Sequence, residues 1–259
     1  MPNHVTNIIR VKNRIEEFKE KFIKLNEDGN EYFDFNEVVP ISSDLDIRSG
    51  SGSYLEDEKE TLELRELLCR TECQNLTQSE FVNLIKDKVK KNNTPIGYLS
   101  YHDNLDTFIK GYYNIKTYGY RDWYNANIDK WGTKWNAYNC AVTENNDDLV
   151  IIFDTAWSTP EPIIQELCKQ GFNFTCIYAD EDLGFNLGIF ESLNGELSYT
   201  DLQEEKDMNR RYLTSLFVKN NCVPYGDDLE GMLETYDYMK EIDLETIEEV
   251  SNELDYLLA

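Results

Sequence analysis

The order of strand-like and helix-like hydrophobic patterns limits the fold of this chain more than any other feature of its sequence. Short β-branched runs, which are typical of strands, occupy residues 3–12, 135–143, 149–156 and 172–179. Apolar residues at helical spacing follow the first run (Ile15, Phe18, Phe22) and the third (Ile163, Ile164, Leu167, Cys168). This order predicts an α+β protein with the split β-α-β-β-α-β arrangement of a ferredoxin-like fold. Each helix has one apolar stripe, so we expect both helices to cover one face of an antiparallel sheet.

Helical patterns interrupt and follow this predicted core. Residues 54–118 contain capping-box spacings and apolar stripes, so they are interpreted as a helical insertion. Two further amphipathic helices are expected within residues 201–259, after a hairpin around Asn194. The predicted domain organisation is therefore a ferredoxin-like core at 1–53 and 119–200, an insertion at 54–118, and an acidic helical C-terminal region at 201–259.

The charge of the chain restricts its partners. Among 259 residues there are 50 Asp and Glu against 25 Lys and Arg, giving a formal net charge of -25. Direct binding to nucleic acid or to an anionic membrane depends on clustered cations, so neither is expected. The sequence has no secretion signal and no apolar run long enough to span a membrane, which predicts a cytoplasmic location in the host cell. The expected partner is a basic protein.

Acidic residues concentrate towards the C-terminus, where Asp227–Ala259 has twelve of them against Lys240 alone. On helices, such carboxylates would form a sparse imitation of the phosphates of a nucleic acid. The alternative is a solvated face that only keeps the protein soluble. The predicted partner-binding residues are Asp227, Asp228, Glu230, Glu234, Asp237, Glu241, Asp243, Glu245, Glu248 and Glu249.

An aromatic cluster is the second candidate contact surface. Residues 112–138 contain nine Tyr and Trp side chains, of which Trp123 and Tyr124 are predicted to bind the partner. Such rings could grip a peptide or stack on bases. They could equally be structural, with Trp131 and Trp135 sealing the edge of the sheet against Trp157.

Carboxylates near predicted strand ends suggest a different chemistry. Asp154, Asp180 and Asp182 could converge on a divalent metal ion, with Lys134 or His4 nearby, as in a metal-dependent hydrolase or nuclease. Ordinary acidic turns would give the same pattern. The sequence has no nucleophile elbow, phosphate-binding loop or dinucleotide-binding motif, so we predict a non-enzymatic protein without a cofactor.

Four segments together carry a resemblance to a known family. Met1-Pro-Asn-His-Val-Thr-Asn7, Trp131-Gly-Thr-Lys-Trp-Asn-Ala-Tyr138, Phe153-Asp-Thr-Ala-Trp-Ser-Thr-Pro160 and Tyr178-Ala-Asp-Glu-Asp182 resemble, in this order, the Api92-like (YubB ferredoxin-like) proteins of phages and plasmids. The resemblance covers about residues 1–40 and 131–195, and implies a ferredoxin-like fold and a mobile-element origin. It marks a set of motif residues with an expected structural role, namely His4, Trp131, Gly132, Lys134, Trp135, Asp154, Trp157 and Asp180.

Charge and resemblance together give a functional hypothesis. We predict a phage-type accessory protein that binds and inhibits a host defence protein that handles nucleic acid, such as a CRISPR effector or a restriction enzyme. Complementary charge would speed the encounter, and aromatic anchors would prolong the complex. The alternatives are the metal-dependent hydrolase that uses Asp154, Asp180 and Asp182, and a module that self-associates through exposed aromatic residues.

Overall fold

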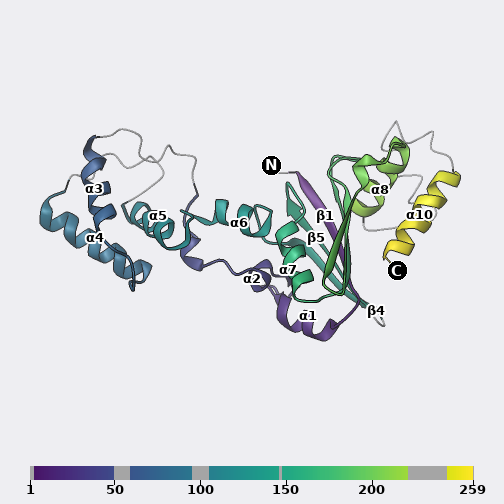
Figure 1. Ribbon diagram of the computed structural model, residues 1–259, viewed down its shortest axis with the longest axis horizontal. Helices are drawn as coiled ribbons and strands as arrows, with labels where there is room; N and C mark the ends of the chain where they lie inside the picture. The colour runs from purple at the N-terminus through teal and green to yellow at the C-terminus, as the bar shows by residue number, and fades with distance from the viewer. Residues whose placement is uncertain (1–2, 50–58, 95–104, 146–147, 221–243, 259) are drawn as a thin grey trace. The chain divides into compact units, whose positions relative to one another are not determined.

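The structure is a computed structural model that describes residues 3–49, 59–94, 105–145, 148–220 and 244–258 (Figure 1). The chain divides into two compact units, Met1–Pro40 with Lys130–Ala259, and Ile41–Asp129. The second unit is longer than the predicted insertion at 54–118, and the C-terminal helices belong to the unit that contains the main sheet. Within the described residues, no helix has the length and apolar composition needed to cross a membrane.

A six-stranded sheet forms the centre of the first unit, with the strand order β4-β5-β1-β6-β7-β8 and every neighbouring pair antiparallel. The four strands β4, β5, β1 and β6, together with the helices after β1 and β5, make the predicted β-α-β-β-α-β core. The ferredoxin-like α+β fold is thus confirmed. The strands are β1 (His4–Val11), β4 (Tyr138–Asn145), β5 (Asp148–Ala156), β6 (Phe174–Asp180), β7 (Gly188–Leu193) and β8 (Glu196–Asp201).

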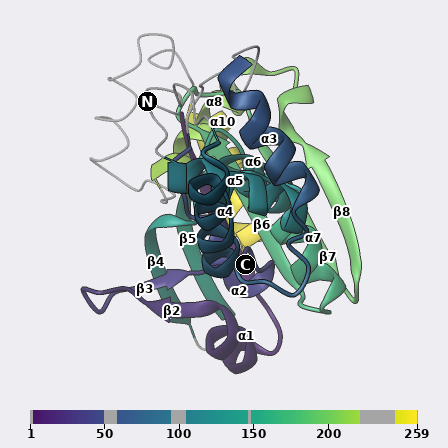
Figure 2. The ribbon, with the colours of Figure 1, turned by 90° about the vertical axis from the view of Figure 1, so that its left-hand side faces the viewer.

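One face of the sheet is covered by α1 (Ile15–Phe22) and α7 (Glu161–Lys169), as expected from their single apolar stripes (Figure 1). Aromatic edge-to-face contacts fill this interface, for example Phe18 with Phe172 at 5.2 Å between ring centroids. A small hairpin, β2 (Ile23–Leu25) and β3 (Glu31–Phe33), and the short helix α2 (Phe35–Val38) follow α1. The hairpin lies beside β4 (Figure 2).

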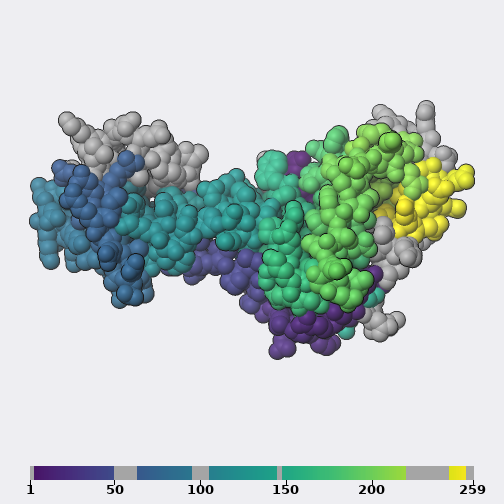
Figure 3. All heavy atoms as spheres, viewed as in Figure 1, coloured from purple at the N-terminus to yellow at the C-terminus, as the bar shows by residue number. Residues whose placement is uncertain are grey.

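The opposite face of the sheet is covered by α8 (Met208–Asn220) and α10 (Leu244–Leu258), the former preceded by the 3-10 turn η2 (Leu202–Glu204). Ile8 of β1 and Ile177 of β6 share a buried cluster with Leu213 of α8 and Val250 of α10. Burial of these side chains, each worth about 1.5–3 kcal/mol, holds the C-terminal helices on the sheet. The outer side of α10 contributes to the molecular surface (Figure 3).

The second unit has its own helical core. Its elements are η1 (Ser43–Leu45), α3 (Lys59–Arg70), α4 (Gln78–Asn92), α5 (Leu105–Tyr118) and α6 (Trp123–Trp131), the last of which ends in the first unit. Leu64, Phe81, Ile85 and Ile109 are fully buried among these helices. The predicted capping box is present at the start of α4, where the Thr77 and Glu80 side chains bind each other's backbone N–H groups.

Candidate functional site

The four sequence motifs meet at one end of the sheet. β1 begins where β5 and β6 end, with His4 opposite Ala156 and Val5 opposite both Thr155 and Asp180. We call this region the motif end and define it as residues 3–7, 131–138, 153–160 and 180–186. Segments that are far apart in the sequence therefore build one surface.

Buried polar groups fix the turn that follows β5. The fully buried Asn7 donates through Nδ2 to the backbone oxygen of Val5 and to Thr155 Oγ1, both at 2.9 Å. Thr159 Oγ1 donates to Asn7 Oδ1 at 2.8 Å, and Thr155 Oγ1 donates to the backbone oxygen of Ser158 at 2.8 Å. Because these buried groups satisfy one another, the turn has one well-defined conformation.

Trp131 and Gly132 lie under this turn. Trp131 is buried with its ring edge against Phe35, and its Nε1 donates to the backbone oxygen of Val39 at 2.9 Å. Gly132 has φ 79°, and a Cβ there would lie 2.6 Å from Cδ of Pro162. Both residues therefore have a packing role at this position.

Trp157 differs from the other motif residues because it is strained and exposed. Its φ is 75°, in the left-handed region that costs a residue with a Cβ roughly 1–2 kcal/mol. Its backbone N–H donates to the oxygen of Asn3 at 3.0 Å, and its backbone oxygen accepts from Asn186 Nδ2 at 3.2 Å. The side chain is nevertheless 55 % exposed. The surroundings thus hold the backbone of Trp157 while leaving the ring to solvent.

Asp180 links the two residues that hold Trp157. Its Oδ1 accepts from Asn3 Nδ2 at 3.2 Å and from the backbone N–H of Asp182 at 2.9 Å, and its Oδ2 accepts from Asn186 Nδ2 at 3.2 Å. Asp180 is only 5 % exposed. All three of these donors are neutral amides. Asn3, Asp180 and Asn186 therefore form one support for the strained tryptophan.

Asn186 and its neighbour Phe185 lie outside the four sequence motifs. Phe185 is 56 % exposed, and Arg211 lies over its ring at 5.8 Å from the centroid. Asn186 has φ 44°, which its short amide side chain tolerates. An exposed Phe followed by Asn after an acidic turn was the available signal, but it is too common in loops to be specific.

The structure does not bring the three predicted metal-binding carboxylates together. Asp154 lies opposite Thr6, whereas Asp180 lies opposite Val5, so the two side chains project to opposite faces of the sheet. Asp154 instead accepts from Thr6 Oγ1 at 3.0 Å and from Asn139 Nδ2 at 2.8 Å. No group of three metal-binding side chains occurs among the described residues. Asp154 and Asp180 therefore do not converge on one position.

His4 and Tyr138 form a polar pair beside this end of the sheet. The Tyr138 hydroxyl lies 3.1 Å from the backbone oxygen of Thr155 and 2.7 Å from His4 Nδ1, so one hydroxyl joins the two groups. Burial, with added repulsion from Asp154 and Glu181, raises the pKa of Tyr138 to about 12. The tyrosine therefore keeps its proton, and both groups serve to position the strands.

The remaining motif residues, Lys134 and Trp135, lie on the surface. Lys134 Nζ lies 4.7 Å from the centroid of the Trp135 ring, which also contacts Tyr138 edge-on. Trp135 is 37 % exposed. Part of the Trp135 ring is thus open to solvent, as is part of the Trp157 ring.

Of the predicted acidic contact residues, Asp227, Asp228, Glu230, Glu234, Asp237, Glu241 and Asp243 lie outside the described residues. Glu245 and Glu248 are exposed on α10. Glu249 and its neighbour Glu253 bind Arg210 of α8 at 2.8 and 2.6 Å. Part of the acidic surface is therefore used within the chain itself.

The two predicted aromatic contact residues lie in the second unit, at the start of α6. The rings of Trp123 and Tyr124 pack edge-to-face with their centroids 5.7 Å apart, and Tyr124 is partly exposed. The side chain of Asp122 caps this turn by accepting from the backbone N–H of Tyr124 at 3.1 Å.

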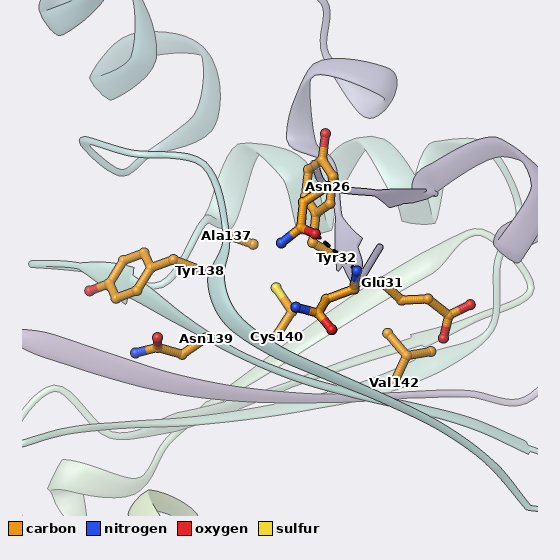
Figure 4. Close-up of a pocket in the computed structure, with 9 residues that line it drawn as sticks. Asn26, Glu31, Tyr32, Ala137, Tyr138, Asn139, Cys140 and Val142 are labelled. Carbon is orange, nitrogen blue, oxygen red and sulfur yellow. Dashed lines mark hydrogen bonds between the residues drawn. The ribbon is translucent and has the colours of Figure 1, made fainter. Parts of the chain in front are cut away.

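A groove lies between the small hairpin and the edge strand β4 (Figure 4). Its volume is about 630 Å³, within the range of ligand-binding clefts. The lining is polar and apolar in about equal parts, and consists of Asn26, Asn30, Glu31, Tyr32, Ala137, Tyr138, Asn139, Cys140 and Val142. Burial raises the pKa of the Cys140 thiol, which lies at the centre of the groove in Figure 4 and is therefore protonated at neutral pH.

The strand order and the helices on the sheet define a protein with a ferredoxin-like α+β domain. Residues 130–216 match the family model described as the ferredoxin-like domain in Api92-like protein, so this part of the chain is similar to that domain. The resemblance predicted from the four motifs is thereby confirmed.

Two further comparisons accompany this match. A crystal structure of the protein Api92 from Yersinia pseudotuberculosis is similar at 8 % sequence identity, with a TM-score of 0.37, over 78 % of this chain and 99 % of that chain. At this score the alignment adds nothing to the fold assignment, which rests on the strand order. No curated protein matches the chain.

Proposed function

We propose that this protein is a non-enzymatic binding module that engages a basic protein, with Trp157 as its principal anchor. The observation that carries the proposal is the exposed ring of Trp157 on a strained backbone held by three motif segments. Backbone strain persists where the surroundings impose it, and it concentrates at functional positions. Exposed tryptophans on rigid supports are also the side chains that dominate protein interfaces.

The class of partner follows from charge. A net charge of -25 attracts a cationic protein and raises its association rate. Exposed Glu245 and Glu248 on α10 belong to the acidic C-terminal region, which resembles a sparse row of phosphates. A protein that handles nucleic acid presents the complementary surface. The phage and plasmid origin implied by the family resemblance makes a host defence protein, such as a CRISPR effector or a restriction enzyme, the proposed target, and inhibition the proposed outcome.

The test begins with affinity capture from host-cell lysate at low salt and identification of the retained proteins by mass spectrometry. The affinity of the purified partner is then measured for wild type, Trp157→Ala and the control Leu193→Ala. Leu193 is also an exposed apolar side chain, but it lies at the end of β7 that is remote from the motif end. Loss of an interface anchor weakens binding by at least about tenfold, whereas the control change leaves it within about twofold.

Two results would overturn the proposal. One is capture of no basic protein. The other is a partner that binds Trp157→Ala as tightly as it binds wild type. The charge component is tested separately with Glu245→Gln/Glu248→Gln, which is expected to lower the association rate and to reduce its dependence on salt. Self-association through the aromatic residues predicts instead that light scattering finds a mass that rises with concentration and falls in Trp157→Ala.

A further inference from the structure

Two exposed aromatic rings at the motif end already have a cation over them. The guanidinium carbon of Arg211 lies 5.8 Å from the centroid of the Phe185 ring. Lys134 Nζ lies 4.7 Å from the centroid of the Trp135 ring. Each cation is attracted to the negative face of the ring below it. Exposed rings in this region are therefore placed where cations reach their faces.

Trp157 is the exception at this end of the sheet. Its side chain is exposed, and no cation lies over its ring within the part of the chain that the structure describes. Among aromatic side chains, the indole ring attracts a cation most strongly. The ring that is best suited to a cation is therefore the one that the chain itself leaves without one.

The charge beside Trp157 favours a cation as the bound group. The carboxylates of residues 180–182 are consecutive, and no ion pair is found for any of them among the described residues. Arg211 and Lys219 of α8 donate instead to backbone oxygens of the same loop. Three negative charges against two positive ones leave this region negative, in a chain whose formal net charge is -25.

Asn3 places the exposed carboxylate of Asp182 beside Trp157. The backbone oxygen of Asn3 accepts from the backbone N–H of Trp157 at 3.0 Å, and Asn3 Nδ2 donates to Asp182 Oδ2 at 3.1 Å. The other carboxylate oxygen of Asp182 accepts no hydrogen bond among the described residues. A planar guanidinium group stacks on an aromatic face and also donates to a carboxylate, which a compact ammonium group does less well. The arrangement therefore suits an arginine side chain.

We propose that the ring of Trp157 binds an arginine side chain, with the guanidinium group stacked on the indole and hydrogen-bonded to Asp182. The inference rests on the proposed function in that this arginine belongs to the same basic partner. It names the group of the partner that Trp157 recognises, and it can be tested without that partner.

The test follows the indole N–H signals of the full-length protein by NMR while a short peptide with a single arginine is added. The chain has four Trp residues, so Trp157→Phe identifies the signal of Trp157 by its loss. The arginine peptide is expected to move this signal more than that of Trp135, whose ring already has Lys134 over it. A peptide with citrulline, which has a neutral group of the same shape, and a peptide with lysine are both expected to bind at least about threefold more weakly.

Two matched variants test the carboxylate at physiological ionic strength, where exposed charges more than about 8 Å apart are largely screened. Asp182→Asn is expected to weaken binding of the arginine peptide at least about threefold, because it removes the charged acceptor. The control Glu191→Gln removes an exposed carboxylate of β7 outside the motif end, and is expected to leave the affinity within about 1.5-fold.

The inference is overturned if the arginine peptide does not move the Trp157 signal, or if the citrulline peptide binds as tightly. Equal binding of the arginine and lysine peptides also overturns it, since net charge alone would then account for the affinity. A captured partner that depends on Trp157, together with an arginine peptide that leaves the signal unmoved, keeps the proposed anchor and excludes arginine as the group it recognises. Failure of this inference and failure of the proposed function are therefore separate results.

Discussion

Replacing Asp180 by Asn tests whether this carboxylate supports Trp157. An Asn keeps one oxygen for Asn3 and Asp182, but its amide nitrogen faces Asn186 Nδ2, so two donors meet where a hydrogen bond existed. A hydrogen bond to a charged group contributes about 1.5–3 kcal/mol, so Asp180→Asn is expected to lower the free energy of unfolding by about 2 kcal/mol. Asp182→Asn removes the same charge at an exposed position that accepts one bond, and is expected to cost at most about 0.5 kcal/mol.

Urea unfolding measures the free energy of unfolding of both variants. Hydrogen exchange of the β1 and β6 amides measures the stability of the sheet alone. The variant also bears on function, because freeing Asn186 releases the backbone oxygen of Trp157. We expect Asp180→Asn to weaken partner binding, and Asp180→Asn combined with Trp157→Ala to bind no more weakly than Trp157→Ala alone. Equal stabilities for Asp180→Asn and Asp182→Asn would refute the reasoning, as would fully additive effects on binding.

Three further changes have definite expected outcomes. Gly132→Ala combines a positive φ with a 2.6 Å contact, so it should lower the free energy of unfolding in urea by at least about 2 kcal/mol. The control Gly195→Ala, with φ 84° and open space around it, should lower it by about 1 kcal/mol, and similar losses for the two variants would contradict the packing described for Gly132. Leu254→Ala should lower the free energy of unfolding by about 2–5 kcal/mol, because it leaves a cavity under α10. Arg210→Ala, which breaks two exposed ion pairs, should lower it by less than about 1 kcal/mol, and the reverse order would mean that ion pairs rather than apolar packing hold α10. Because the folded-state pKa of Tyr138 is raised to about 12, its contribution to the stability of the folded state is complete below about pH 10 and is lost as pH rises towards 12. Tyr138→Phe should therefore reduce the loss of stability at alkaline pH, and an unchanged dependence of stability on pH would show that Tyr138 does not cause that loss.

The sheet could be predicted because its signals are local. Each strand of the core carries its own β-branched run, and α1 and α7 each carry one apolar stripe that requires a covering surface. No local sequence pattern marks where the second unit begins and ends. Its beginning at Ile41 depends on contacts between η1 and α5, for example the 2.7 Å hydrogen bond from Tyr118 to Asp44. The sequence around η1 predicts only a loop.

The site was only partly predictable. The motifs marked the right end of the sheet, but whether Asp154 and Asp180 share a face depends on strand register, and a shift of one residue reverses the answer. The support of Trp157 by Asn3 and Asn186 depends on loops that meet only in three dimensions. The register shift in β4 between Tyr138 and Ala141 is marked by no composition signal.

The central position of β1 affects how the protein is made. Ile8 lies opposite Ile152 and Ile177, so the first strand has neither neighbour until most of the chain has been synthesised. At roughly 5–20 residues per second, this strand waits on the order of ten seconds at the ribosome with both edges unpaired. The helices of residues 41–129, whose contacts are shorter in sequence, can assemble during that interval. Chaperone dependence of newly made protein should therefore be governed by the apolar residues of β1, and slowing translation after residue 129 should lengthen the period in which the nascent chain can aggregate.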